Sequence, residues 1–376
     1  MSERPFETVV VVGVGLVGGS FAAAVRGLPD PPRVLGVEPS AEAREFAVRE
    51  GIVDEALDED AAETAGWFAS GSGRETLVLL AAPVKGVEAW LERLGSLGFG
   101  GVVTDAASTK SSVFAAAGKL SAGAVFIGGH PMAGSERSGV TAADPDLFRD
   151  AYYVLTPSEN TDADAYRRLH ALVSSLGARV IAVAPALHDE AVAVISHVPH
   201  VAASALTNLA AERAGDGREV LRLAAGGFKD MTRIAAGSPE LWTGILSDNG
   251  PAVSRAIGEL VDQLLELRGS LDSGDLESMR AWLSRAAEVR RSLPAKWVPA
   301  TAALSVLSIP MVDRPGMVGT ITQAAAHAGC NIEDIEIDHQ TEDRALLRLV
   351  LTDEGDFQAL LAQLSREGFD TDLRPL

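Results

Sequence analysis

The stretch 8-TVVVVGVGLVGGS-20 decides the fold of the first half of the chain. Its apolar run at residues 8–12 predicts a buried strand, and the alanine-rich segment after it has a helical composition. Between them stand three glycines, at Gly13, Gly15 and Gly18. In a dinucleotide-binding unit the first glycine makes a tight turn, the second lets the backbone approach the pyrophosphate, and the third lets the helix pack on the strand. The stretch therefore predicts a phosphate-binding loop at the start of a helix.

The acid expected for ribose recognition is also present. Glu38 ends the next predicted strand, 20 residues after Gly18, where a carboxylate can accept both ribose hydroxyls. It would repel a 2′-phosphate, and no arginine follows it directly, so NAD is favoured over NADP. A glycine turn in an unrelated α/β domain is the alternative, and the position between a strand and a helix argues against it. The predicted cofactor-binding residues are Gly13, Gly15, Leu16, Val17, Gly18, Glu38, Ala82 and Pro83.

Composition narrows the class of protein. A chain of 376 residues predicts roughly two or three domains. Lys and Arg total 32 against 52 Asp and Glu, and the net charge of −20 argues against a nucleic-acid or anionic membrane surface. Cys330 is the single cysteine and the N-terminus MSERPFE has no signal character, so we expect a cytoplasmic protein. The uncharged run at residues 8–25 borders on the length of a membrane span, but its glycines form the phosphate-loop pattern.

Two kinds of pattern divide the first 300 residues. Short β-branched runs alternate with helix-length stretches, which predicts a mostly parallel sheet covered on both faces, an α/β Rossmann-type doubly wound domain over residues 1–184. Alanine- and leucine-rich segments with helical spacing follow, and they predict an all-α domain for dimerisation and substrate binding over residues 185–296. The predicted strands of the first domain are residues 8–12, 33–37, 76–81, 101–104, 124–127, 152–156 and 179–183.

A third unit is expected after a proline-containing linker at residues 293–299. Its predicted order, βαββαβ, is that of a ferredoxin-like domain over residues 303–376. The predicted elements are a strand at 304–309, a helix at 316–328, strands at 331–338 and 345–351, a helix at 357–367 and a strand at 371–374.

His130 is the strongest candidate for chemistry. It opens the segment 130-HPMAGSE-136, after a predicted strand and two glycines, so we expect its ring at the carboxyl edge of the sheet beside the nicotinamide. Imidazole is the side chain best suited to take a proton near neutral pH. A loop histidine that is hydrogen-bonded for structure is the alternative. Ser108 follows the strand at 101–104 and should reach the same edge.

Two further clusters add imidazoles and cations. His197 and His200 are three residues apart in a helical stretch and share a face. No carboxylate or cysteine stands at ligand spacing from them, so we predict no metal site, and we expect a buried hydrogen-bonding role for His197. Lys229 and Arg233 are four apart, which puts both cations on one side of a helix. They form either a solvated surface or, for the arginine, a bidentate site for a substrate carboxylate.

Taken together, these segments resemble the prephenate dehydrogenase family of tyrosine biosynthesis. The matching segments span nearly all of the first 300 residues in order: VVGVGLVGGS, TDAAST, GGHPMAGSE, ISHVPH and GGFKDMTRIAAGSPELW. The resemblance implies NAD-dependent oxidative decarboxylation of prephenate to 4-hydroxyphenylpyruvate. It further implies that His130 takes the proton of the ring hydroxyl and that Ser108 orients both groups.

By the same resemblance, Arg233 binds a substrate carboxylate and His200 lines the pocket, while Lys229, Asp230 and Trp242 border the site. One departure from the family pattern is Ala106-Ala107 before Ser108, where a glycine is common.

The last unit contains the segment IPMVDRPGMVGTITQAAAHAGCNIEDIEI, and through it about the final 74 residues resemble an ACT domain, a module that often binds an amino acid and regulates a biosynthetic enzyme. The resemblance implies tyrosine as a feedback ligand near Asp313, Gly316 and Asn331. A domain that only aids assembly is the alternative, because βαββαβ modules host unrelated functions.

Three other functions remain open from the sequence. An arogenate dehydrogenase would share fold and mechanism. A β-hydroxyacid or 6-phosphogluconate type of dehydrogenase also joins such domains, but it uses a helix-borne lysine where this chain has His197 and His200. A non-catalytic regulator that binds NAD and an amino acid is the third possibility.

Overall fold

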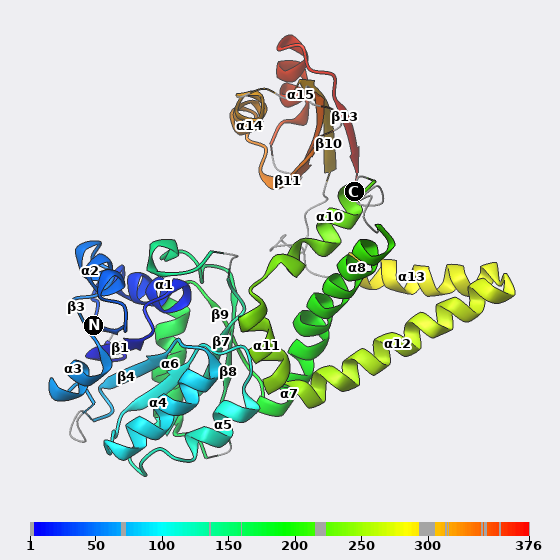
Figure 1. Cartoon of the computed structure of the whole chain (residues 1–376). Helices are drawn as coiled ribbons and strands as arrows, with labels where there is room; N and C mark the ends of the chain where they lie inside the picture. The colour runs from blue at the N-terminus through cyan, green and yellow to red at the C-terminus, as the bar shows by residue number, and fades with distance from the viewer. Residues whose placement is uncertain are drawn as a thin grey trace. The chain divides into compact units, whose positions relative to one another are not determined.

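The computed structural model describes residues 4–68, 73–134, 137–158, 160–214, 223–292, 305–312, 314, 316–339, 341, 344–352 and 355–375. The chain forms two compact units, Met1–Asp262 and Gln263–Leu376 (Figure 1).

The first unit is built on a six-stranded parallel sheet of order β3-β2-β1-β4-β5-β6. This is the Rossmann-type order, and it reverses beside β1, so the ligand crevice lies at the carboxyl end of that strand. The strands are β1 Thr8–Val12, β2 Arg33–Val37, β3 Glu55–Leu57, β4 Thr76–Leu80, β5 Val102–Asp105 and β6 Val125–Phe126. The helices between and after them are α1 Leu16–Arg26, α2 Ala41–Arg49, α3 Glu59–Thr64, α4 Val84–Ser96, α5 Ser111–Ala117 and α6 Ala163–Ser175.

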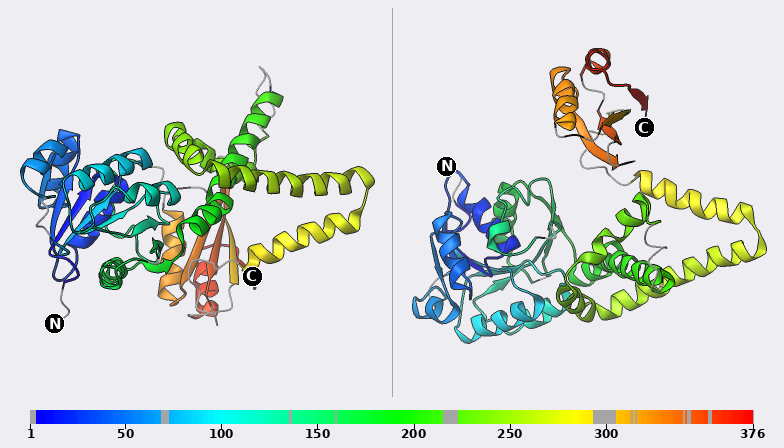
Figure 2. Two further views of the ribbon diagram at one scale, coloured as in Figure 1. Left: turned by 90° about the horizontal axis from the view of Figure 1, so that it is seen from below. Right: turned by 45° about the horizontal axis from the view of Figure 1, so that its top comes forward.

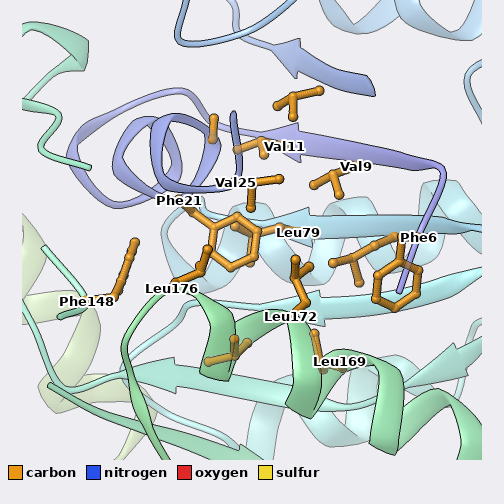
Figure 3. Packing of buried hydrophobic residues seen from close by; sticks show 14 of the residues in the cluster. Phe6, Val9, Val11, Phe21, Val25, Leu79, Phe148, Leu169, Leu172 and Leu176 are labelled. Carbon is orange, nitrogen blue, oxygen red and sulfur yellow. The ribbon is translucent and has the colours of Figure 1, made fainter. Parts of the chain in front are cut away.

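Side chains of this sheet alternate between two hydrophobic cores, as the pleat of a strand requires. Val9 and Val11 of β1 belong to the cluster under α1 and α6, where Phe21 and Leu172 pack (Figure 3). The alternate residues of β1 and β4 belong to a second cluster that includes Trp90 of α4. Both faces are therefore covered by helices, which confirms the predicted parallel sheet of an α/β Rossmann-type domain. The uncharged run at residues 8–25 is divided between β1 and α1.

A separate three-stranded sheet holds the last strands of this region, β7 Gly128–Pro131, β8 Tyr152–Thr156 and β9 Arg179–Ala182. β7 runs antiparallel to β8, and His130 pairs with Val154. The expectation that the strands at 152–156 and 179–183 continue the main parallel sheet was therefore wrong, and His130 lies on a strand that the sequence did not predict. The physical reason lies in Gly129, where a Cβ atom would stand 2.5 Å from the Asp105 carbonyl oxygen. The two glycines let the chain pass close to β5 and continue as a strand.

Helices are the only regular elements among the described residues from 185 to 292, as the sequence predicted (Figure 2). A π-helical turn separates α7 from α8, and a 3-10 helix follows α10. The elements are α7 Pro185–Val192, the π turn Ala193–His197, α8 Val198–Ala214, α10 Gly226–Thr232, the 3-10 helix Arg233–Ala236, α11 Pro239–Asp248, α12 Gly250–Ser273 and α13 Leu276–Ser292.

The helix Pro185–Arg213 contains an 18-residue window with a mean hydropathy of 1.2 and is the one helix in the described part of the chain that is long and apolar enough to cross a membrane. Length and composition alone are weak evidence for a span, and a packed helix of a globular domain passes the same test. This helix buries the polar side chains of His188, Asp189 and His197.

In the second unit, α12 turns back into α13 at Gly274 and Asp275, and Arg285 lies 3.6 Å from Glu266. A small antiparallel sheet of order β11-β12-β10-β13 follows, with its own buried core that includes Leu307 and Leu347. The element order is the predicted βαββαβ, whereas the predicted linker lies outside the described residues. The elements are β10 Ser305–Val312, α14 Met317–His327, β11 Ile332–His339, β12 Arg344–Leu351, α15 Phe357–Arg366 and β13 Asp372–Pro375.

Candidate active site

The glycine loop has the geometry that phosphate binding requires. Gly13 has a φ of +88°, and a Cβ atom there would lie 2.6 Å from the Ala81 carbonyl oxygen. At Gly18 a Cβ atom would lie 2.0 Å from the Gly13 oxygen, so only glycine lets α1 approach β1 this closely. The corresponding position at Gly15 has no atom within 4 Å, which leaves the backbone open to a ligand. Gly15 caps α1 without a side-chain hydrogen bond, so the first N–H groups of the helix can bind phosphate.

Glu38 is held directly against this loop. Its carboxylate accepts hydrogen bonds from the backbone N–H groups of Val14 and Ser40, both at 3.1 Å. The nearby Arg44 donates instead to the carbonyl oxygens of Glu38 and Pro39, at 2.7 and 2.8 Å. An acid beside the loop and an arginine turned to the backbone fit a cofactor with a free 2′-hydroxyl, which is NAD.

Ala82 and Pro83 lie between the carboxyl end of β4 and the start of α4, where Ala82 is partly buried and Pro83 is exposed. This is the edge of the sheet where a nicotinamide ring is expected in such folds.

The loop that carries Ser108 is fixed by a buried ion pair. Asp105 pairs with the Lys110 ammonium, and its carboxylate also accepts the N–H groups of Ala107 and Gly129 at 3.0 Å. Lys110 donates in addition to the Gly129 carbonyl oxygen at 2.7 Å. Burial lowers the pKa of Lys110, although the neighbouring carboxylate opposes that shift. The pair ties the loop between β5 and α5 to β7, so the predicted Ser108 lies on a segment anchored beside the strand of His130.

His130, which is partly buried, joins two buried side chains in a network that the sequence did not predict. Its Nδ1 lies 2.8 Å from Nε2 of His188, and Nδ1 of His188 lies 2.8 Å from Oδ1 of Asp189. Asp189 also accepts the N–H groups of Lys110 and Ser111, at 2.8 and 2.7 Å. Burial opposes the ionisation of Asp189. The hydrogen bonds from His188, Ser111 and Lys110 outweigh that effect and lower the pKa of Asp189 to about 2. This carboxylate is ionised at neutral pH.

The surroundings keep His130 neutral. Burial lowers its pKa well below the ordinary value, the positive charge of Lys110 and the rings of His188 and His197 act in the same direction, and Asp189 opposes them. A neutral imidazole has one nitrogen free to accept a proton, as a general base requires.

The same network continues through Asn249 to the predicted pocket residues. The Asn249 amide donates to the Asp189 carbonyl oxygen at 2.8 Å and lies 3.2 Å from Nδ1 of His197. His197 contacts the edge of Trp242 at 6.2 Å between ring centres, and Trp242 stacks on His200 at 3.6 Å. The buried Nδ1 of His200 has no hydrogen-bond partner within the described residues. Burial lowers the pKa of both histidines. The structure thus brings His130, His200 and Trp242 into one connected set.

The cations lie elsewhere in the first unit. Lys229 and Asp230 on α10, and Arg233 at the start of the 3-10 helix, are exposed side chains on elements that pack along α8. They are not buried in a dry cleft of the single chain.

The predicted regulatory residues lie in the second unit. Gly316 caps α14 with a φ of +95°, and the Asn331 carbonyl oxygen accepts the Thr352 N–H at 3.2 Å. Asp313 lies outside the described residues. Among those that are described, no group of three or more His, Cys, Asp or Glu side chains could hold a metal ion.

A Rossmann-type sheet, a glycine loop with its ribose acid and a neutral histidine at the sheet edge together define a dinucleotide-dependent dehydrogenase. The nucleotide-binding domain of prephenate dehydrogenase matches residues 21–182, and the dimerization domain of prephenate dehydrogenase matches residues 184–285. The chain belongs to the prephenate dehydrogenase family. It is an NAD-dependent oxidoreductase.

Individual relatives agree with this assignment. The prephenate dehydrogenase of Bacillus subtilis (strain 168) is 33% identical over 93% of both chains, and that of Lactococcus lactis is 31% identical over 76% of this chain and 77% of its own. The crystal structure of prephenate dehydrogenase from A. aeolicus, in complex with hydroxyphenyl propionate and NAD+, has a TM-score of 0.71 at 29% identity and covers 77% of this chain and 99% of its own. The crystal structure of a Synechocystis arogenate dehydrogenase has a TM-score of 0.64 at 31% identity and covers 76% of this chain and 100% of its own. These similarities support the prephenate dehydrogenase function.

Proposed function

We propose that the chain catalyses the NAD-dependent oxidative decarboxylation of prephenate to 4-hydroxyphenylpyruvate, with His130 as the general base. The observation that carries this role is the neutral His130 ring, anchored through His188 and held beside the loop of Ser108. When bound, NAD accepts the hydride that leaves the hydroxyl-bearing ring carbon. The residues of the chain supply the base, the orientation and the charge.

His130 acts as the hydride departs. Loss of hydride builds positive charge on the carbon that carries the hydroxyl, and removal of the hydroxyl proton by the neutral imidazole relieves it. Ser108 orients the hydroxyl. The bond between the ring and its carboxylate then breaks, its electron pair enters the ring, and CO2 leaves as the ring becomes an aromatic phenolate. The phenolate takes back the proton held by His130 and becomes the phenol of 4-hydroxyphenylpyruvate. General-base assistance of this kind contributes about 10² to 10⁴ in rate.

Substrate binding is assigned to Arg233, His200, Lys229 and Trp242. The stacking of Trp242 on His200 supports this assignment. The buried Nδ1 of His200 has no hydrogen-bond partner within the described residues, so a substrate group can bond to it. Arg233 offers the planar donor pair that suits a carboxylate. Arg233→Ala should therefore raise KM for prephenate far more than it lowers kcat, and an unchanged KM would place the carboxylate site elsewhere.

The decisive experiment is an assay of NADH formation from prephenate and NAD, with NADP in a parallel reaction. We expect turnover with NAD and much weaker turnover with NADP. NAD binding without NADH formation from prephenate or arogenate would instead support the non-catalytic regulator.

Arogenate is the second candidate substrate, favoured by the similarity to the Synechocystis arogenate dehydrogenase structure. The two substrates differ in an amine against a keto group on the side chain. Side-by-side values of kcat/KM decide between them, and a higher value with arogenate would reassign the enzyme.

For the second unit we propose an ACT-like regulatory domain that binds tyrosine, with Asp313, Gly316 and Asn331 near the ligand. Support comes from the βαββαβ order and from the Bacillus subtilis relative, whose match over 93% of this chain must include most of this region. The domain boundaries that we propose are 1–184, 185–296 and 303–376. We place the enzyme in the cytoplasm, since its one cysteine is a buried free thiol.

We also propose a homodimer. The helices from 185 to 292 leave many large apolar side chains exposed, which a monomeric soluble protein rarely does, and the family match over 184–285 is to a dimerization domain. The mass in solution should be twice the chain mass of 39.2 kDa. The exposed side chains include Leu187, Val194, Ile195, Leu209, Leu264, Leu265, Leu271, Leu276, Leu283 and Val289.

A further inference from the structure

We propose that His188 and Asp189 are positioning residues that fix the tautomer of His130, so that its Nε2 is the atom that accepts the substrate proton. The inference rests on the proposed role of His130 as the base. It follows from the two hydrogen bonds that link the three side chains and from the donors that surround Asp189.

The tautomer of His130 follows from the position of the proton in each hydrogen bond that links Asp189, His188 and His130. Asp189 is an ionised carboxylate and can only accept, so Nδ1 of His188 carries the proton of their shared hydrogen bond. A neutral His188 then has a lone pair on Nε2 and can only accept there. The contact with His130 therefore needs a proton on Nδ1 of His130, which leaves Nε2 of His130 with the free lone pair.

Asp189 is itself fixed from several sides. The N–H groups of Lys110 and Ser111 hold its two carboxylate oxygens, and Asn249 holds its carbonyl oxygen. His188 is only 2% exposed, so it cannot turn to another partner in solvent. Because these groups are already in place, little reorganisation is needed when the proton moves.

The arrangement also accommodates the charge that the reaction creates. When Nε2 of His130 takes the hydroxyl proton, the ring becomes a cation that still donates its Nδ1–H to His188. The Asp189 carboxylate lies beyond His188 and stabilises that cation. The neighbouring Lys110 charge is offset by Asp105, so it opposes the step less than a free ammonium would.

Two substitutions at His188 separate positioning from packing. His188→Gln places an amide oxygen close to the position of Nε2 and can still accept from His130, whereas His188→Phe fills the ring volume without an acceptor. We expect kcat to fall about 100-fold in the Phe variant, at the lower end of general-base effects. The Gln variant should stay within about tenfold of the unchanged enzyme on the same scale.

KM for prephenate and the Kd for NAD should change by no more than a few-fold in both variants, and thermal melting shows whether each is folded. Equal losses in the two variants would assign His188 to packing alone. Unchanged kcat in the Phe variant would remove His188 from the mechanism. Either result overturns the proposal.

A spectroscopic measurement tests the tautomer without turnover. In the NAD-bound enzyme with 15N-labelled histidine, the His130 signals are identified by their loss in His130→Asn. We expect the proton on Nδ1 in the unsubstituted enzyme and a mixture of tautomers in His188→Phe. A proton on Nε2 of His130 in the unsubstituted enzyme, as a doubly protonated His188 would impose, contradicts the proposal.

The same measurement distinguishes the two levels of inference. If the enzyme fails to form NADH from prephenate, the proposed function falls while the tautomer can still be read. If it turns prephenate over with the proton on Nε2, the function stands and the positioning role is wrong.

Discussion

His130 is the residue whose replacement should affect chemistry most directly. His130→Asn keeps a polar side chain of smaller size but removes the base, so we expect kcat to fall by about 10² to 10⁴. KM for prephenate should stay within a few-fold, because the carboxylate contacts are made by other residues. Steady-state kinetics measure both, with NAD binding as the control for folding. Unchanged turnover would exclude His130 as the base.

The lowered pKa of His130 also predicts how activity depends on pH. A depressed pKa means that the neutral, proton-accepting form already dominates at neutral pH. Activity is lost only as the pH falls below the ordinary histidine value of about 6.5 and the ring takes a proton. We expect kcat/KM to be flat around pH 7 and to decline on the acid side below that value. An acid limb centred above it would contradict the assignment.

Glu38 should control the choice of cofactor. Its carboxylate is bound to Val14 and Ser40 beside the glycine loop, where a 2′-phosphate would meet a negative charge. Glu38→Ser removes that repulsion and one ribose contact, so the preference for NAD over NADP should fall by at least about tenfold, equivalent to 1.4 kcal/mol. The ratio of kcat/KM for the two cofactors is the measurement. Asp30→Ser, an exposed acid outside the loop, is the control and should leave the ratio unchanged.

At the scale of elements, the π turn at Ala193–His197 sets the orientation of two parts of the site. In a regular α-helix each residue turns by about 100°, so Asp189 and His197, eight residues apart, would be offset by about 80°. A π turn absorbs one residue and reduces the offset to about 20°. Both residues then reach Asn249, as the structure has them.

Insertion of one residue into this turn should separate those parts. An extra alanine after Ile195 adds about 100° of rotation between Asp189 and His197, so His197 and His200 no longer align with Asp189. We expect higher KM and lower kcat for prephenate, with NAD affinity retained because the glycine loop lies on other elements. Deletion of Ile195 is the matched control, because it makes the helix regular, places His197 seven residues after Asp189 and keeps the offset of about 20°. Ile195 also belongs to the proposed dimer surface, so the mass in solution of both variants is measured as well. An insertion without a kinetic effect would show that the register of this helix does not matter.

The elements that the sequence predicted best are those with continuous apolar runs. β1, β2 and β8 have the predicted bounds because their β-branched and aromatic residues are bounded by turn residues. β3 was missed, since three residues give no periodicity. β7 was missed because Gly-Gly-His-Pro has a poor strand propensity, and pairing with β8 overrides it.

The residues of the candidate site also divide into those that the sequence predicted and those that it missed. His130 and Trp242 stand in motifs that carry their own signal, so the sequence pointed to both. His188 and Asp189 were missed because their relation to His130 spans 58 positions and arises only when α7 packs beside β7. The available signal was a run of three ionisable residues, His188, Asp189 and Glu190, in an otherwise apolar helix.

At the scale of the whole molecule, the C-terminal βαββαβ domain, residues 303–376, should carry regulation and not chemistry. Its sheet has a core of its own, separate from those of the first unit, and the residues proposed for catalysis lie before residue 262. Truncation after Pro299 should therefore keep NADH formation from prephenate and abolish inhibition by tyrosine. Inhibition curves of the full chain and the truncated chain make the comparison. Equal inhibition in both would refute a tyrosine site in this unit.

The contact between His130 and His188 has a further consequence, because it joins the two segments that match different domains of the family, 21–182 and 184–285. A hydrogen bond at 2.8 Å is lost once its partners separate by about 1 Å. Any hinge motion that opens the space between these segments for substrate entry would thus release His130 from its partner and leave its ring free to rotate. If substrate enters by such an opening, the orientation of the base depends on closure, and oxidation would begin only after the two segments have come together around the substrate.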